Sequence, residues 1–398
     1  MKQIIAVIPL MFSAGLMSFS ASAAEQDFSQ CKVKLEKAAV AQGIQQSTIE
    51  KGLRDLKPIK RVIKLDRSQP EFSQTFADYF NKRVTSKRVA QGRKLLKKHR
   101  ALLQKLQKEY GVPPQYLMSF WGLETNFGGY KGKMPVLDAL ATLACDPRRD
   151  SFFTQEFILA LGLMEKNGFE PQQMVGSWAG AMGHTQFMPS AYSQYAVDGD
   201  GDGIVDLWNS TEDALTSAAN FLAELGWQRN ERWGREVLLP SDYNFKYLGA
   251  KDRLPLSQWA EAGVRQANGQ AISTPKMDAA LYVPAGQAGP AFLAYENFNV
   301  IMRWNRSENY AIAVGHLADR INGAAPLQKK PPLQTRLSRA QIKALQQSLI
   351  DLGYELGKAD GIMGKQSIAA LQQYQRSQGM IADGYPSEDS FKALSIKL

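Results

Sequence analysis

A long helical pattern between Asp27 and Gly234 is the feature that most constrains the fold of this chain. Apolar side chains recur there with the spacing that places them on one face of a helix. Glycine and proline mark most of the interruptions, as is typical of helix ends. The pattern predicts a mainly α fold, with helices over residues 30–42, 72–80, 87–110, 114–125, 152–166, 189–197 and 211–225.

The pattern changes between Glu236 and Asn297. Short apolar runs at 237–239, 280–283 and 291–295 indicate a few short strands joined by loops. Helical spacing returns near residues 310–321. We therefore expect an α+β core in which helices dominate.

The end of the chain resembles a separate unit. Residues 322–334 form a linker by composition, and their prolines favour an extended conformation. Beyond them, residues 338–352 and 365–378 each have the pattern of an amphipathic helix. The sequence therefore predicts a leader at 1–24, a main region at 25–321, a linker at 322–334 and a C-terminal module at 335–398.

The first residues predict export. Lys2 precedes an apolar run at 4–17, and small residues follow at 18–24, which is the arrangement of a secretory signal peptide cleaved after Ala23 or Ala24. The apolar run is too short to predict a membrane span. No lipid-attachment motif flanks Cys31, so we expect a soluble periplasmic protein that is not a lipoprotein.

The chain has two cysteines, Cys31 and Cys145. In an oxidising compartment two cysteines can form one disulfide, and two unrelated buried thiols are the alternative. Two Cys and three His are too few for a thiol-rich or histidine-rich zinc site.

A net charge of +10 indicates an anionic partner. Many of the cations lie between Lys82 and Lys108, where leucines recur with helical spacing. These cations form either the solvated face of an amphipathic helix or a binding surface. The signal peptide argues against nucleic acid as the ligand, and an anionic cell wall fits better.

One carboxylate stands out in segment 121–129 (Trp-Gly-Leu-Glu-Thr-Asn-Phe-Gly-Gly). Glu124 ends an apolar run that starts at Tyr116, and glycines follow closely. Apolar surroundings disfavour the charged form of a carboxyl group and raise its pKa, so that it can donate a proton to a leaving oxygen. The alternative is an ordinary solvated glutamate at a helix end.

Two further segments have the composition of a sugar-binding groove. Segment 177–190 (Ser-Trp-Ala-Gly-Ala-Met-Gly-His-Thr-Gln-Phe-Met-Pro-Ser) is dense in glycine, which lets backbone approach a ligand while Gln186 and Met188 line the groove. Segment 297–310 combines aromatic rings, on which sugars stack, with amides that hydrogen-bond. The alternatives are simple packing of the first segment and a core aromatic stripe in the second.

Segment 198–206 (Asp-Gly-Asp-Gly-Asp-Gly-Ile-Val-Asp) has the pattern of a calcium loop. Asp198, Asp200 and Asp202 supply oxygens at positions 1, 3 and 5, and Ile204 supplies a carbonyl at position 7. Asn209 stands at position 12, where a bidentate Glu is usual. The calcium ion would be structural.

The closing ligand of this loop is open. A longer loop would recruit Glu212 or Asp213. As an alternative to metal binding, Ser210 and Asp213 also fit a capping box at the start of the next helix.

Together, the motifs at 121–128, 179–190, 198–206 and 303–307 resemble those of the lytic murein transglycosylase B family. The resemblance runs from about Phe28 to Ile321. The tail resembles the small three-helix peptidoglycan-binding domain, with Asp-Gly-Ile-Met-Gly at 360–364 as its signature loop.

The resemblance implies a lysozyme-like fold and an enzyme that cleaves the β-1,4 bond after N-acetylmuramic acid. It implies that Glu124 is the single acid and base, that Ser177 holds Glu124, and that Gln186 contacts the sugar. The further groove residues that it implies are Tyr79, Asn305 and Tyr310.

Two positions depart from the family pattern, because Trp304 and Phe221 stand where a tyrosine is frequent. Stacking survives at Trp304, which we keep as a groove residue, whereas Phe221 is left out of the predicted site. Peptidoglycan is the expected partner, other cell-wall enzymes are candidate partners, and a monomer without an organic cofactor is expected.

Two rival functions remain. A hydrolytic muramidase would need a second carboxylate within about 5–10 Å of the first. The nearest acidic residue after Glu124 in sequence is Asp138, which is flanked by apolar residues and is more simply structural. A non-catalytic wall-binding scaffold is the second rival, and the presence of Glu124, Ser177 and Gln186 argues against it.

Overall fold

The computed structural model describes residues 19–68 and 74–398. Residues 1–18 of the expected signal peptide lie outside the described residues. Within the described ranges, no helix combines the length and the apolar character needed to cross a membrane.

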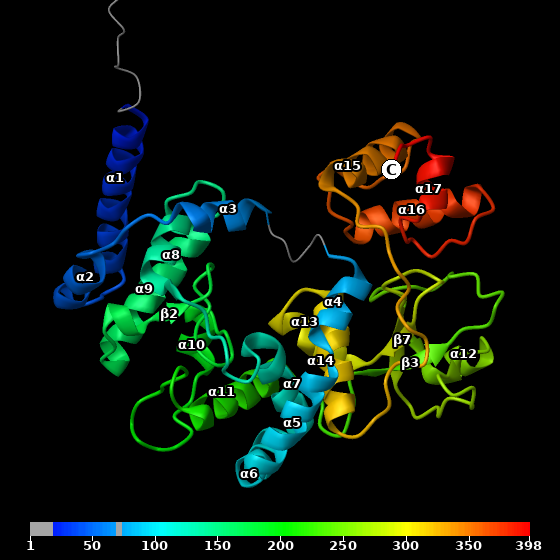
Figure 1. Ribbon diagram of the computed structural model, residues 1–398, viewed down its shortest axis with the longest axis horizontal. Helices are drawn as coiled ribbons and strands as arrows, with labels where there is room; N and C mark the ends of the chain where they lie inside the picture. Colours follow the sequence, from blue (N-terminus) through cyan, green and yellow to red (C-terminus); the bar gives the residue numbers. More distant parts are fainter. Residues whose placement is uncertain (1–18, 69–73) are drawn as a thin grey trace, which may run out of the picture.

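Helices dominate the described chain, as predicted (Figure 1). Before the sheet they are α1 (Phe19–Ala41), α2 (Gln46–Leu53), α3 (Lys60–Ser68), α4 (Phe76–Arg83), α5 (Ser86–Lys98), α6 (Arg100–Tyr110), α7 (Pro114–Thr125), α8 (Val136–Ala144), α9 (Asp150–Asn167), the 3-10 helix η2 (Pro171–Gln173), α10 (Pro189–Tyr195) and α11 (Thr211–Glu224). Side-chain caps explain several starts: Thr75, Thr85 and Ser210 each accept a hydrogen bond from a backbone N–H three residues later.

The prediction of a single helix over residues 87–110 is wrong, because the chain is interrupted at His99, between α5 and α6. His99 has φ −99° and ψ 22°, which is not helical. Its ring packs edge-on against Trp121 at 5.8 Å between centroids. After the break, α6 buries Leu103 and Leu106 in the core. This contact with Trp121 is tertiary, and the spacing of the leucines gave no sign of it.

A five-stranded antiparallel sheet follows, with strand order β4-β6-β7-β3-β5. Its longer strands overlap the three apolar runs that predicted strands. The bounds are β3 (Gly234–Leu238), β4 (Leu254–Pro255), β5 (Arg265–Gln266), β6 (Asp278–Tyr282) and β7 (Ala291–Ala294), with α12 (Leu256–Glu261) between β4 and β5. A separate pair joins β1 (Met134–Pro135) to β2 (Val175–Gly176), and α13 (Glu296–Trp304) and α14 (Glu308–Ile321) follow the sheet.

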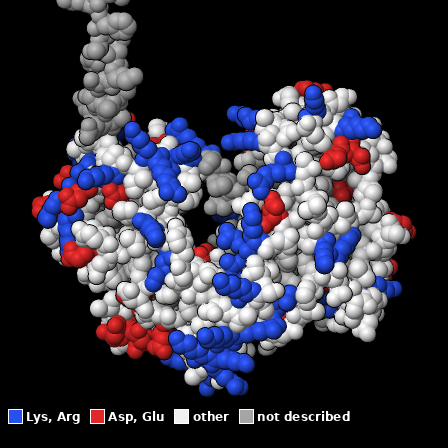
Figure 2. All heavy atoms as spheres, in the orientation of Figure 1, with Lys and Arg blue, Asp and Glu red and all other residues white. Residues whose placement is uncertain are grey.

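Two large buried clusters flank the middle of the molecule. One is built mainly from α4 to α7, α13 and α14, and the other mainly from α1, α2, α8 and α9. Figure 2 shows a hollow in the surface between these two parts. Trp304 packs against both clusters. Within the second part, a disulfide joins Cys31 on α1 to Cys145 at the end of α8, which is the paired alternative of the two expected for the cysteines.

The C-terminal helices α15 (Arg339–Asp351), α16 (Lys365–Ser377) and α17 (Glu388–Ala393) surround their own small core. The preceding segment 322–334 has no strand and is attached along the main region. The backbone N–H groups of Gln328 and Lys329 donate to the Glu236 carboxylate at 2.9 and 2.8 Å. Leu327 is buried in the first large cluster.

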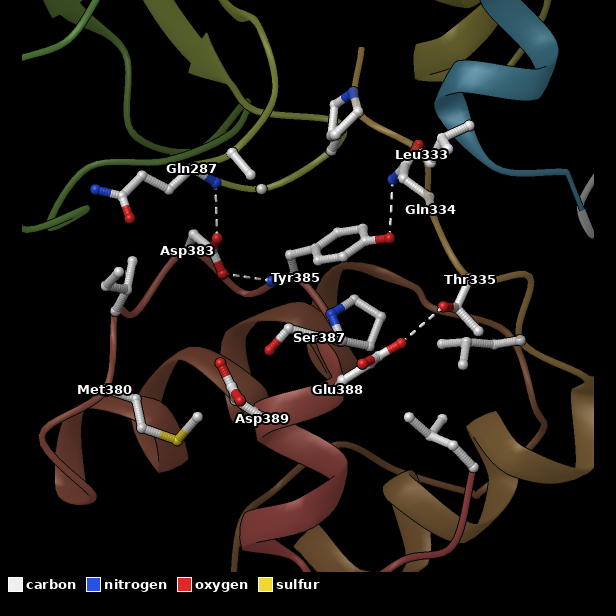
Figure 3. Close-up of a pocket in the computed structure, with 18 of the residues that line it drawn as sticks. Gln287, Leu333, Gln334, Thr335, Met380, Asp383, Tyr385, Ser387, Glu388 and Asp389 are labelled. Carbon is white, nitrogen blue, oxygen red and sulfur yellow. Dashed lines mark hydrogen bonds between the residues drawn. The ribbon is translucent and has the colours of Figure 1, made fainter.

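The loop between α16 and α17 also contacts the main region directly (Figure 3). The backbone N–H of Gln287 donates to Asp383 at 2.8 Å, and Gln334 donates to the hydroxyl of Tyr385 at 2.8 Å. A cavity of about 640 Å³ lies in this junction, away from Glu124. The module is therefore docked on the main region, which the composition of the linker did not indicate.

Candidate active site

Glu124 lies at the C-terminal end of α7, a helix in which residues 116–123 are buried. The helix ends because Asn126 and Phe127 both adopt positive φ, at 52° and 59°. Non-glycine residues rarely take this conformation, and such strain concentrates at functional sites. The hydroxyl of Thr125 donates to the carbonyl of His184 at 2.8 Å, which fixes the helix end to segment 177–190.

Two hydrogen bonds orient the carboxyl group of Glu124. The indole N–H of Trp304 donates to Oε1 at 3.1 Å, and the hydroxyl of Tyr310 donates to the same oxygen at 2.5 Å. No residue in the described ranges bonds Oε2. One oxygen is thus held by the protein while the other is available to a ligand.

Burial raises the pKa of Glu124 to about 7. The hydrogen bonds from Tyr310 and Trp304 and the charge of Arg83 act in the opposite direction, because they favour the carboxylate. The loss of solvating water outweighs them. An acid with this pKa is protonated in a large fraction of molecules at neutral pH, and it becomes a useful base once the proton has left.

No described carboxylate is among the groups that shift the pKa of Glu124. Asp138 lies on α8, where its Oδ1 accepts the backbone N–H of Lys57 at 2.7 Å. This bond ties α8 to the segment before α3, so Asp138 has the structural role that its sequence context indicated. Among the residues that the structure describes, the site therefore has one carboxyl group rather than the pair that most glycosidases use.

Trp304 is the centre of an aromatic wall beside Glu124. Its ring centroid lies 4.6 Å from that of Phe120, 5.3 Å from Phe187 and 5.0 Å from Phe221. Phe221 in turn stacks on Tyr195 at 4.5 Å. Phe221, which the sequence reasoning left out, is therefore part of this wall. Its lack of a polar atom removed the signal on which that reasoning relied.

Tyr79 lies on α4 and is buried in the same cluster as Tyr310. The guanidinium of Arg83, one turn later, lies 5.3 Å from the centre of the Tyr79 ring. The charge of Arg83 lowers the pKa values of both Glu124 and Tyr310, although burial raises each of them overall. Sequence reasoning missed Arg83, because it stood out only as one of many cations in a basic segment.

Ser177 does not hold Glu124 in the structure. Its hydroxyl oxygen accepts the backbone N–H groups of Ala179 at 3.3 Å and Ala181 at 3.0 Å. Segment 177–181 forms a tight turn, and these two N–H groups need an acceptor. The bonds to Glu124 come from Trp304 and Tyr310 instead.

Gln186 has a positive φ of 52°, which is unusual for a glutamine. Its amide N–H₂ group donates to the carbonyls of Lys131 at 3.1 Å and Gly183 at 2.9 Å. Met188 is half-buried against the second cluster, and Asn305 is exposed at the C-terminal end of α13. The structure thus brings Glu124, Trp304 and Tyr310 into direct contact. None of the other expected site residues forms a hydrogen bond with the Glu124 carboxyl group among the described residues.

The acidic loop, which begins three residues after Tyr195, forms a compact cluster of its own. Carboxylate oxygens of Asp198, Asp200 and Asp202 lie within 4.8 Å of one another. Three carboxylates at this spacing have the chemistry that a hard cation such as calcium prefers. Ile204 and Glu212 are exposed, and the backbone N–H of Ile204 donates to Asp202 at 2.8 Å.

Asp213, an expected closing ligand, has a different role. Its Oδ1 accepts the N–H of Gly199 at 2.8 Å, and its Oδ2 accepts the N–H of Asp206 at 2.7 Å. The backbone N–H of Asp213 donates to the hydroxyl of Ser210, so Ser210 caps α11, but the capping box that was the alternative to the metal site lacks its reciprocal bond from Ser210 to the Asp213 carboxylate. The cap and the three-carboxylate cluster coexist, and Asp213 anchors the loop to α11.

Known proteins resemble this chain in sequence. A family model described as Transglycosylase SLT domain matches residues 27–319, and a model of a peptidoglycan binding domain matches residues 338–394. Membrane-bound lytic murein transglycosylase B of Escherichia coli (strain K12) is 34% identical over 249 residues. That match covers 61% of this chain and 66% of the relative, which is slightly less than two thirds of its length.

Solved structures resemble it in fold. SltB3 from Pseudomonas aeruginosa, in complex with NAG-anhNAM-pentapeptide, has a TM-score of 0.89 at 37% identity, covering 92% of this chain and 99% of that one. The Escherichia coli lytic transglycosylase Slt35, in complex with calcium, has a TM-score of 0.64 at 31% identity, covering 74% and 92%. The expected lysozyme-like, mainly α fold is thereby confirmed.

Proposed function

Because this chain belongs to the transglycosylase SLT domain family, whose model spans residues 27–319, we propose that it is a peptidoglycan lytic transglycosylase. It cleaves the β-1,4 bond between N-acetylmuramic acid and N-acetylglucosamine and leaves a 1,6-anhydromuramic end. The observation that carries this proposal is a half-buried carboxyl group, Glu124, which is oriented through one oxygen by Trp304 and Tyr310 and has no second carboxylate acting on it among the described residues.

In the first step Glu124 acts as the acid. Its proton passes to the glycosidic oxygen as the bond from that oxygen to the anomeric carbon of the muramic residue breaks. The carbonyl oxygen of the neighbouring N-acetyl group bonds to the anomeric carbon, as in other substrate-assisted glycosidases. The leaving N-acetylglucosamine carries away a free hydroxyl group, and Glu124 is left as a carboxylate.

In the second step the Glu124 carboxylate acts as the base. It takes the proton from the C6 hydroxyl of the same muramic residue, and O6 bonds to the anomeric carbon as the acetamido oxygen departs. No water is consumed, and Glu124 ends protonated. Internal closure competes with water because well-oriented groups have effective concentrations up to about 10⁵ M or more.

Product masses distinguish this reaction from its rivals. Purified peptidoglycan should yield soluble muropeptides that are about 18 Da lighter than hydrolytic products, because ring closure replaces the addition of water. Mostly hydrated reducing ends would make the protein a muramidase. No soluble products from an intact, folded protein would favour the scaffold.

The remaining parts support this activity. The residues at 335–398 form a wall-binding module, and the linker at 322–334 connects it to the catalytic region at 25–321. Residues 1–24 direct the protein to the periplasm. Asp198, Asp200 and Asp202 hold a structural calcium ion with the Ile204 carbonyl, and Glu212 is the remaining candidate to close the site. The donor chemistry and the calcium complex of Slt35 support this assignment.

A further inference from the structure

A face of positive charge covers α5 and α6. Its exposed cations are Lys87, Arg93, Lys94, Lys97, Lys98, Arg100, Lys105 and Lys108. Figure 2 shows Lys and Arg side chains gathered over these two helices at the lower end of the molecule. The sequence contains no acidic residue between Asp78 and Glu109. We call these eight side chains the basic face.

The basic face is not neutralised within the described residues. None of its cations forms an ion pair with a described carboxylate. Like charges crowded on one surface repel, and Lys87 in the first turn of α5 also opposes the helix dipole. An anionic partner would relieve both effects.

The first residue of the basic face, Lys87, is the sequence neighbour of Arg88, which lies beside the active site. Arg88, in the first turn of α5, bonds through its Nε to Asn126 Oδ1 at 3.4 Å, two residues after Glu124. Arg83, just before α5, acts on the charge of Glu124 itself. From this point α5 extends for about 20 Å at the rise of an α-helix. Positive charge therefore continues from the cleavage point outward along the surface.

A membrane fits this surface poorly. Helices that bind lipid surfaces present exposed apolar side chains beside their cations. The exposed large hydrophobic residues of the described chain all lie outside α5 and α6. A polar anionic partner that needs no apolar contacts, and that is already held near Glu124, fits the basic face better than a membrane does.

We propose that the basic face binds free carboxylates on the peptide stems of the peptidoglycan strand whose sugar backbone lies at Glu124. This inference rests on the proposed function and adds a substrate preference to it. Strands whose stems carry negative charge bind tightly, whereas strands of the same shape without that charge bind weakly. The cations act on substrate binding and leave the chemistry at Glu124 unchanged.

The test compares two variants that lose the same charge. In the first, Lys94, Lys97, Lys98 and Lys105 are each changed to Gln. In the control, the exposed Lys34, Lys37, Lys251 and Lys276, which lie on α1 and in the sheet region, are changed to Gln. The substrates are soluble peptidoglycan strands and the same strands with their carboxylates converted to neutral amides.

At low salt the first variant should have a KM on native strands raised roughly tenfold, from four exposed charge contacts of a few tenths of a kcal/mol each, with kcat unchanged. Its KM should also depend less on salt. On the amidated strands the wild type and both variants should behave alike. An equal rise in the control variant, or a rise that persists on amidated strands, would overturn the inference. The inference would also be overturned if the first variant lost binding to vesicles of anionic phospholipid while its KM on native strands stayed unchanged.

These outcomes are separate from a failure of the proposed function. If the wild type released no anhydromuropeptides from either substrate, the activity itself would be wrong. If it released them with the same KM from charged and amidated strands, only the role of the basic face would be wrong.

Discussion

At the scale of single residues, the protonation state of Glu124 depends on burial and hydrogen bonding, which shift its pKa in opposite directions. Tyr310, Trp304 and Arg83 all favour the carboxylate, yet burial keeps the pKa near 7. The result is a group that can give up a proton and take one back at the same pH. A solvated glutamate, with a pKa near 4.5, would be a poor acid there.

Glu124→Gln should abolish most of the turnover while leaving the fold intact. The amide keeps the shape of the side chain but has no acidic proton to transfer to the leaving oxygen, so activity should fall at least about 100-fold. Muropeptide release from peptidoglycan is the measurement, with the exposed Glu261→Gln as a control. Near-normal lysis by Glu124→Gln would rule out the assigned role.

The same variant should change the pH dependence of stability. The folded state raises the pKa of Glu124 from 4.5 to about 7, so the unfolded chain releases this proton more readily. The wild type should therefore lose stability relative to Glu124→Gln as pH rises from about 4.5 to 7. Below that window the difference in Tm should be constant.

Tyr310→Phe should move the alkaline limb of the pH profile to higher pH. The Tyr310 hydroxyl donates to Glu124 and stabilises its carboxylate, so its removal should raise the pKa of the acid. The measurement is kcat/KM as a function of pH, with Tyr247→Phe as a control distant in sequence. A limb displaced to lower pH would show that the hydroxyl does not act on Glu124 in this way.

At the scale of elements, the acidic loop shows two roles for neighbouring carboxylates. Carboxylate oxygens of Asp198, Asp200 and Asp202 lie within 4.8 Å of one another. Asp213 is not part of this cluster and accepts backbone N–H groups through both of its oxygens. Asp198 also accepts backbone N–H groups through both oxygens, so the position of the oxygens, and not the presence of N–H donors, distinguishes the two roles.

The two roles predict different responses to metal removal. Asp202→Asn should lose the rise in Tm that calcium gives and should match the wild type in chelator, because ligand binding stabilises only by mass action. Asp213→Ala should lower Tm even in chelator, since it empties a buried position and leaves two half-buried N–H groups without this acceptor. If the wild type after thorough stripping melted at the same temperature with and without calcium, the loop would be a cap alone.

At the scale of the whole molecule, the C-terminal module is both tethered and docked. Gln334 accepts the N–H of Ala77 at 2.9 Å, and Arg336 pairs with Asp78 at 2.6 Å. The exposed ion pair contributes little stability. The half-buried contacts around Gln287 and Asp383 contribute more, because their polar groups are partnered across the junction.

Truncation at Pro331 should leave a folded protein that is active on soluble strands and weaker on intact sacculi, because a wall-binding module raises local concentration. The lost junction should also lower Tm. Gly286→Val is the matched variant: Gly286 has φ 66°, and a Cβ there would lie 2.6 Å from Asp383 Oδ2. It should lower Tm and retain sacculus binding. Equal pull-down by sacculi with and without the module would contradict its role.

The sequence by itself determined part of the local structure of this protein. The pattern around residues 114–125 predicted a helix with the bounds of α7, because those bounds depend on local proline and on the turn after Thr125. The apolar runs placed β3, β6 and β7 for the same reason. Family motifs singled out Glu124, Trp304 and Tyr310 as candidates.

Only the tertiary structure decided how these residues act. Trp304 and Tyr310 lie 180 and 186 residues from Glu124 in sequence, and packing of α13 and α14 against α7 selects them as its partners over Ser177. The break at His99 and the anchoring role of Asp213 likewise depend on contacts between elements. Spacing in a sequence indicates the type of local structure, whereas burial, hydrogen-bond partners and breaks such as the one at His99 depend on separate segments packing together.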